Sequence, residues 1–123
     1  MKKVALIILL LSSMMKTVLY AAPEPRIEAI KVPFYVGQTV MACGRLAEVT
    51  HLEKIHFLNL DKAYHEQSLS IVIFADDYIS FVRRFGDIDK LVGAKFCARG
   101  EIEDYRGRLQ IIVKNPQFLR LMK

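Results

Sequence analysis

The sequence lacks the short motifs that mark the common catalytic and metal sites. It contains no Cys-x-x-Cys pair, no Gly-x-Ser-x-Gly segment, no phosphate-binding loop and no paired cysteine and histidine, so the usual catalytic signatures are missing. Its histidines, His51, His56 and His65, do not stand at metal-ligand spacing from one another or from a cysteine. We interpret them as hydrogen-bonded or solvated side chains. We therefore predict no enzymatic activity, no metal site and no cofactor.

A long uninterrupted apolar run is also missing. The most apolar stretch, residues 4–22, has nineteen residues and contains Lys16, whereas a membrane-spanning helix needs about 20 predominantly apolar residues. Two lysines precede this short apolar core and small residues end it, which is typical of an export signal. We predict that residues 1–22 form a signal peptide, cleaved after Ala21 or Ala22. The mature protein is then periplasmic or secreted, with no membrane anchor; an uncleaved anchor helix is the alternative.

The excess of positive charge is small once this signal is removed. The whole chain carries 18 basic and 13 acidic residues, a net charge of +5. Because three of the lysines lie in the signal, the mature chain of 101 residues has 15 basic and 13 acidic side chains, a net charge of +2. A nucleic-acid-binding domain usually shows a pronounced basic patch, so any such patch must be local. A chain of this length forms one domain with one modest core.

Alternation of apolar and polar residues predicts five strands. Every second residue from Val40 to Leu46 is apolar or glycine, and a period of two with β-branched residues is typical of a strand. Residues 23–36 are predicted to be a linker or a short helical turn stopped by Pro33, and residues 37–120 to form the folded domain. The predicted strands are residues 39–49, 54–60, 68–74, 94–104 and 108–114.

One amphipathic helix is predicted between the third and fourth strands. Ile79, Val82 and Phe85 recur at positions i, i+3 and i+6, the spacing of an apolar helical stripe. The aspartates at 76–77 precede this stripe as a cap, and Gly86 follows it as a stop.

Short strands that are apolar on one face favour a small closed barrel, because closure removes exposed strand edges. Gly44 and Gly100 occupy similar places in the segments "ACGRL" and "ARGEI", and we expect both glycines to let their strands bend sharply. We predict an all-β fold, a five-stranded closed barrel, with the apolar stripe of the helix plugging one end.

Three segments carry a resemblance to a known family. The segments "VGQTVMACGRLAEV", "FLNLDKAYHEQSLSIVIF" and "VGAKFCARGEIEDYRGRLQIIVKNPQ" resemble the bacterial exported OB-fold domains, and the match runs from about Val36 to Gln117. Asp61 stands where the family pattern has a glycine, and His65 where it has a proline. The resemblance implies an OB-fold barrel with one helix between strands three and four. It also implies a likeness to nucleic-acid-binding OB-folds, such as the anticodon-binding kind.

The two cysteines are candidates for a disulfide. Cys43 and Cys97 occupy outward positions in the first and fourth predicted strands, and in an OB-fold these strands are antiparallel neighbours. An exported chain meets an oxidising compartment, where an even cysteine count favours a bridge. We predict a Cys43–Cys97 disulfide; two unpaired thiols are the alternative.

The candidate binding residues follow from the way OB-folds bind single strands, through strands two and three and two adjoining loops. If Leu58 and Leu60 point inward, then Phe57 points outward to stack a base and Asn59 to bond its edge. The loop between strands four and five adds Tyr105, Arg106 and Arg108, and Arg45, Lys54 and Arg99 add charge nearby. We predict weak binding of single-stranded nucleic acid, with no membrane partner after signal cleavage.

Other interpretations of the same residues stay open. Phe57 belongs to the core if the register slips by one residue. Residues 106–107 also fit a simple tight hairpin turn, and the flanking arginines have Glu103 and Asp104 close enough in sequence to pair with them. The alternative function is a module that binds an envelope protein or a small ligand on this face, with no nucleic-acid role.

Overall fold

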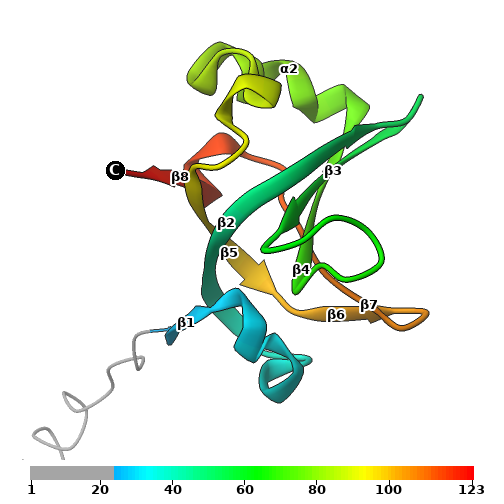
Figure 1. Ribbon diagram of the computed structural model, residues 1–123, viewed down its shortest axis with the longest axis vertical. Helices are drawn as coiled ribbons and strands as arrows, with labels where there is room; N and C mark the ends of the chain where they lie inside the picture. Colours follow the sequence, from blue (N-terminus) through cyan, green and yellow to red (C-terminus); the bar gives the residue numbers. More distant parts are fainter. Residues whose placement is uncertain (1–23) are drawn as a thin grey trace, which may run out of the picture.

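The computed structural model describes residues 24–123, which form a strongly curved β-sheet with an α-helix at one end (Figure 1). The predicted signal peptide, residues 1–22, lies outside the described residues. The helical elements of the described part are the 3-10 helices η2 (Ala29–Tyr35), η3 (Ile88–Leu91) and η4 (Pro116–Phe118) and the α-helix α2 (Ala75–Phe85). The strands are β1 (Arg26–Glu28), β2 (Thr39–His51), β3 (Ile55–Leu60), β4 (Leu69–Phe74), β5 (Lys95–Glu101), β6 (Glu103–Tyr105), β7 (Arg108–Ile112) and β8 (Leu119–Met122).

All five predicted strands are present, each with ends within a few residues of those expected. The predicted fourth strand is interrupted at Ile102, which separates β5 from β6. The two additional strands, β1 and β8, have three and four residues, too few to show a period of two. Pro33 lies inside η2 and does not end it.

The predicted closed five-stranded barrel is not confirmed. The strands pair in the order β6-β7-β4-β3-β2-β5-β8, with β1 beside β2, so the path of described strands is open at β6 and β8. The sheet nevertheless turns back on itself. Strand β5 pairs with β2, and β6, which follows β5 after the single residue Ile102, pairs with β7. No helix within residues 24–123 has the length and apolar character needed to cross a membrane.

The core lies on the inner face of this curved sheet, where the alternation places it. Val40, Ala42 and Leu46 of β2 join one buried cluster with Leu58 and Leu60 of β3. The cluster also contains Ile71 and Ile73 of β4, Phe96 and Ala98 of β5, Ile111 of β7, and Val113. The period-two pattern therefore identifies the inner face of the long strands.

Helix α2 packs on the core through a different face from the one predicted. Phe81 is buried and Tyr78 and Phe85 pack against the core, whereas Ile79 is 58% exposed and Val82 is 38% exposed. At about 100° of rotation per residue, positions 78, 81 and 85 lie within an arc of about 60° around the helix axis, whereas positions 79, 82 and 85 cover an arc of about 120°. The prediction for Ile79 and Val82 is wrong because the narrower stripe packs inward.

The ends of α2 confirm the predicted stop but not the predicted cap. Gly86 follows the helix with φ 77°, a conformation that glycine adopts at little cost. The N-cap is Phe74, with no side-chain hydrogen bond. Asp76 and Asp77 lie in the first turn instead, where their charges favour the positive end of the helix dipole.

Gly44 and Gly100 serve close packing. A Cβ on Gly44 would lie 2.8 Å from Asp61 Oδ1, and a Cβ on Gly100 would lie 2.7 Å from Ile111 Cγ2. Both distances are shorter than ordinary contacts between heavy atoms, so neither position has room for a side chain. Gly44 therefore lets Asp61 lie close to β2, and Gly100 lets Ile111 of β7 lie close to β5.

The predicted disulfide is confirmed. Cys43 of β2 and Cys97 of β5 are directly opposite in the antiparallel register, with their Cα atoms 4.0 Å apart and their sulfur atoms bonded. The bond links positions that are 54 residues apart in the chain. It therefore ties the first long strand to the second half of the chain.

Candidate functional site

A β-bulge in β2 places polar side chains on the outer face of the sheet. The register shifts between Leu46 and Glu48. Before this shift, the inward-facing residues of β2 have even numbers, ending with Leu46; after it they have odd numbers, and Val49 packs against the core. Glu48 lies opposite Asn59, and Thr50 opposite Phe57. These four outer residues line a hollow of about 400 Å³ together with Leu52, Tyr64 and Arg108.

Phe57 lies on this outer face but is not an open stacking surface. It is only 9% exposed, and the guanidinium carbon of Arg108 stands 4.5 Å from the centre of its ring. The same guanidinium carbon lies 5.5 Å from the ring of Tyr105. An incoming aromatic group would therefore meet Arg108 before it met Phe57.

Asn59 holds neighbouring side chains in place. It is 2% exposed; its amide donates to Glu48 Oε1 at 2.8 Å, and its carbonyl oxygen accepts from Ser70 Oγ at 2.7 Å. Gln67 in turn donates to Ser70 Oγ at 3.1 Å. With both ends of its amide bonded, Asn59 holds Glu48 and Ser70, the two side chains that bond the loop 61–68 at Tyr64 and Gln67, and its amide faces these partners.

The Glu48 carboxylate is stabilised in its charged form. The backbone N–H of Tyr64 donates to it at 3.1 Å, and this bond, followed by the one from Asn59, lowers the Glu48 pKa against a smaller opposing effect of burial. A negative charge therefore sits in the hollow beside Arg108. This charge disfavours phosphate at that point.

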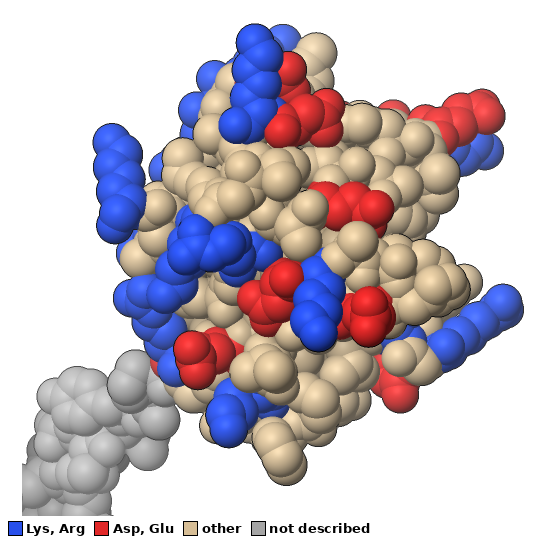
Figure 2. All heavy atoms as spheres, viewed as in Figure 1, with Lys and Arg blue, Asp and Glu red and all other residues tan. Residues whose placement is uncertain are grey.

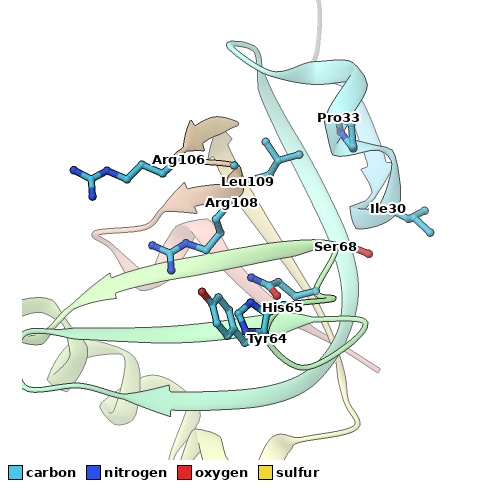
Figure 3. A pocket seen from close by; sticks show the side chains of 10 residues that line it. Ile30, Pro33, Tyr64, His65, Ser68, Arg106, Arg108 and Leu109 are labelled. Atoms are coloured by element: carbon cyan, nitrogen blue, oxygen red, sulfur yellow. The ribbon is translucent and has the colours of Figure 1, made fainter.

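A second hollow, of about 440 Å³, adjoins the first and contains no acidic side chain (Figure 3). Tyr64 and Arg108 line both hollows. Figure 3 shows Tyr64 and His65 on the loop side and Arg106 and Arg108 on the hairpin side, with Arg106 extending away from the other labelled side chains. Among the described residues, two buried polar atoms have no hydrogen-bond partner, Arg108 Nε and Gln67 Oε1, and both residues line this hollow.

The turn between β6 and β7 presents its arginines without acidic partners. Arg106 and Gly107 both have positive φ, 51° and 88°, as a tight two-residue hairpin requires, and Asp104 accepts from the Gly107 N–H at 2.8 Å. The described salt bridges, His51–Asp89 and Arg99–Glu24, include neither turn arginine. The alternative in which Glu103 and Asp104 neutralise these arginines is therefore not supported.

Three predicted site residues lie apart from the two hollows. The side chain of Arg45 donates to the Gly93 carbonyl, and Arg99 donates both guanidinium hydrogen bonds to Glu24 at 2.6 Å. Lys54 lies in the short connection between β2 and β3. The structure brings together Phe57, Asn59, Tyr105, Arg106 and Arg108.

Sequence reasoning missed Glu48, Tyr64 and Gln67 as parts of this site. Tyr64 is 56% exposed, and it is the only aromatic residue in the polar segment 61–68, which is the one signal that could have identified it. Asp61 begins that segment with φ 75°, a conformation for which the glycine of the family pattern is better suited.

The basic side chains gather on another part of the molecule. Figure 2 shows lysine and arginine concentrated on the side where β8 and β1 lie in Figure 1, with acidic residues among them toward the middle of the view. Arg99 and Arg120 line a hollow there with Phe118, and it shares no lining residue with the hollows beside Tyr64. Within residues 24–123, no group of three or more His, Cys, Asp or Glu side chains is arranged to hold a metal ion.

Comparisons with known proteins support the fold. No protein-family model matches the chain, and no curated protein matches it. Among solved structures, it is similar to the S. pombe Stn1-ten1 complex, at 21% identity and a TM-score of 0.53 over 74% of this chain and 68% of that one.

Two further solved structures are similar over a larger part of this chain. The OBody AM1L10 bound to hen egg-white lysozyme matches at 13% identity and a TM-score of 0.56, over 85% of this chain and 99% of that one. A putative aspartyl-tRNA synthetase from Leishmania major Friedlin matches at 13% identity and a TM-score of 0.54, over 85% of this chain but 22% of that one. The described residues form an OB-fold-like domain.

Proposed function

We propose that this protein is an exported OB-fold module that binds single-stranded nucleic acid weakly, through the two hollows that meet at Arg108. The observation that carries the proposal is the position of the Arg108 guanidinium, which lies over Phe57, near Tyr105, and has an unpartnered buried Nε. Tyr64 stands exposed on the other side of the same hollows. Aromatic rings interleaved with cations are the usual means of binding single strands.

The charges of this site support weak binding, micromolar at best. Arg106 and Arg108 are the cations beside the hollows, whereas Glu48 supplies a negative charge. In a plot of the logarithm of the binding constant against the logarithm of the salt concentration, each phosphate contact with a single strand contributes about −0.7 to the slope. Contacts from the two arginines therefore predict a slope of about −1.4. A much steeper slope would indicate that the basic side of the molecule binds instead.

The test is a titration of a fluorescent single-stranded oligonucleotide at low and moderate salt. Tyr64→Ala removes an exposed ring and should weaken binding at least about fivefold, because a stacked base contributes about 1–3 kcal/mol. Arg108→Gln, Arg106→Ala and Phe57→Ala should also weaken it, whereas Glu48→Gln should strengthen it by removing a repulsive charge. Arg120→Gln, on the basic side, is the control and should leave affinity unchanged. No binding at low salt would overturn the proposal.

A protein partner is the second candidate, and the comparisons favour it specifically. The OBody is bound to hen egg-white lysozyme, and Stn1-ten1 is a complex, so similar domains take part in protein complexes. Leu52, Tyr64 and Tyr105 are exposed near the site, and tyrosine and arginine are enriched where binding energy concentrates. If Tyr64→Ala and Arg108→Gln weaken capture of an envelope protein while no oligonucleotide binds, this candidate replaces the first.

Export is part of the same proposal, and the Cys43–Cys97 disulfide supports it, because such bonds persist in oxidising compartments. The mass of the protein recovered from the periplasmic or secreted fraction tests it. Loss of the first 21 or 22 residues is the expected result, and a full-length chain confined to the cytoplasm would contradict it.

A further inference from the structure

Two histidines that are separated in sequence meet where β2 ends and β3 begins. His51 and His56 are directly opposite in the antiparallel register, and their Nδ1 atoms are 2.7 Å apart. The other ring nitrogen of His51, Nε2, lies 2.9 Å from one oxygen of Asp89, on η3, and 3.0 Å from the other. His56 stacks on the ring of Tyr78, on α2, with ring centres 3.8 Å apart.

The carboxylate of Asp89 determines where the protons lie in this cluster. A carboxylate only accepts hydrogen bonds, so Nε2 of His51 carries a proton, and in the neutral form of the ring its Nδ1 presents a lone pair. His56 then donates its Nδ1 proton into that lone pair across the 2.7 Å contact. A single proton therefore links the two rings across a gap that is short enough for both nitrogens to reach one ion.

A metal cation can replace that proton as the link between the two rings, at a position to one side of the line that joins the nitrogens. If His56 carries its proton on Nε2 instead, both Nδ1 atoms become ligands for one ion. With metal–nitrogen bonds of about 2.0 Å, adjacent ligands in a square-planar site stand about 2.8 Å apart, and ligands in a tetrahedral site about 3.3 Å apart. The observed separation of 2.7 Å fits adjacent square-planar positions, which Cu²⁺ and Ni²⁺ adopt.

We propose that His51 and His56 form a two-imidazole site for a divalent transition-metal cation, with Cu²⁺ bound most tightly and water completing its coordination. Imidazole is a suitable ligand for copper, nickel and zinc, and the order of affinities for a given site places Cu²⁺ first. Asp89 is the positioning residue: metal-binding histidines usually donate their second ring N–H to a carboxylate, which fixes the ring and strengthens the ligand.

The surroundings of the pair favour a cation. Asp89 supplies a negative charge, and Tyr78 holds the ring of His56 from one side. His51 is exposed, which leaves a path for the ion. None of these four residues lines the hollows at Arg108, so this site is independent of the proposed function.

The test is a Cu²⁺ titration of the mature protein, free of any affinity tag, followed by visible absorbance and by broadening of the histidine ring proton signals in NMR spectra. We expect one Cu²⁺ per chain at neutral pH, with the signals of His51 and His56 broadened first. His56→Gln leaves a single imidazole and should lower affinity by more than about tenfold. Asp89→Asn should lower it about 10- to 100-fold.

Two controls make the result decisive. His65→Gln removes the third histidine, which lies against Tyr64 in the hollow beside Arg108, and should leave Cu²⁺ affinity unchanged. The double variant His51→Gln/His56→Gln retains the N-terminal amine and every other ligand group, so it measures background binding, and its far-UV circular dichroism checks that it folds. Equal Cu²⁺ affinity in the folded double variant and the wild type would overturn the proposal, as would the absence of saturable binding to the wild type.

Discussion

Removal of the Cys43–Cys97 disulfide should lower the free energy of unfolding by about 4 kcal/mol. The bond joins positions 54 residues apart, and closing a loop of that length in the unfolded chain removes about 14 cal/mol/K of conformational entropy, or about 4 kcal/mol at 25 °C. A domain of this size has a total stability of about 5–15 kcal/mol. The bond therefore supplies a large share of the stability.

The variant Cys43→Ala/Cys97→Ala isolates this effect. Both cysteines are nearly buried, and alanine leaves the pairing of β2 with β5 intact from Thr39 to Arg45. The variant should fold to the same structure but melt about 15–30 °C lower, because 1 kcal/mol shifts the midpoint of a small domain by about 4–8 °C. Its unfolded state is also more expanded, so the dependence of stability on denaturant should steepen.

Urea unfolding followed by far-UV circular dichroism measures both quantities, with and without reductant. Reductant should move the wild-type midpoint to that of the variant and leave the variant unchanged. The reasoning is refuted if the oxidised wild type and the variant unfold at the same urea concentration, or if reductant shifts the variant as well.

Two further outcomes follow from the packing and the charges. Gly100→Ala places a Cβ 2.7 Å from the buried Ile111 Cγ2 and should lower stability by about 1–3 kcal/mol, the usual cost of overpacking, measured in the same urea assay. Burial, followed by the charges of Asp89 and Asp87, raises the pKa of Tyr78 to about 12. Because folding favours its neutral form, the stability that Tyr78 contributes is present below pH 10 and declines as pH rises from about 10 towards 12. Tyr78→Phe should flatten that decline in urea midpoints measured between pH 9 and 11.5, and an unchanged decline would contradict the assignment.

The strands and the disulfide could be predicted because their signals are local. Val40, Ala42 and Leu46 alternate with outward residues along one segment, and a period of two is a direct consequence of strand geometry. The same alternation placed Cys43 and Cys97 outside the core cluster, and their cross-strand pairing followed once strands one and four were taken as neighbours. That these strands are neighbours came from the resemblance to OB-folds, and the predicted export added an oxidising compartment.

The helix face and the short strands could not be predicted so readily. Two apolar stripes compete on α2, and only contact with the core selects Phe81 over Ile79. β1 and β8 have too few residues to show a period. They are strands because longer neighbours, β2 and β5, offer them free edges.

The candidate site was predicted in part. Phe57 and the hairpin arginines lie together because β7 pairs beside β4 and β4 beside β3, an arrangement that the fold implies. The covering of Phe57 by Arg108 and the bonding of Asn59 to Glu48 depend on side-chain contacts between distant segments. No local pattern encodes such contacts.

The bulge in β2 links the two proposed sites physically. Without the register shift between Leu46 and Glu48, Glu48 and Thr50 would continue the inward series of Val40, Ala42 and Leu46, because a shift of one residue exchanges the faces of a strand. With it, Glu48 turns outward beside Arg108.

The same shift sends His51 to the opposite face of β2, where Tyr78 and Asp89 lie. One extra residue near Ala47 thus gives a single strand two chemically distinct faces: an outer one that carries Glu48 and Thr50, and one that carries His51 beside Tyr78 and Asp89. Because the disulfide at Cys43 anchors β2 on the other side of the bulge, both faces belong to a strand that is fixed in register against β5.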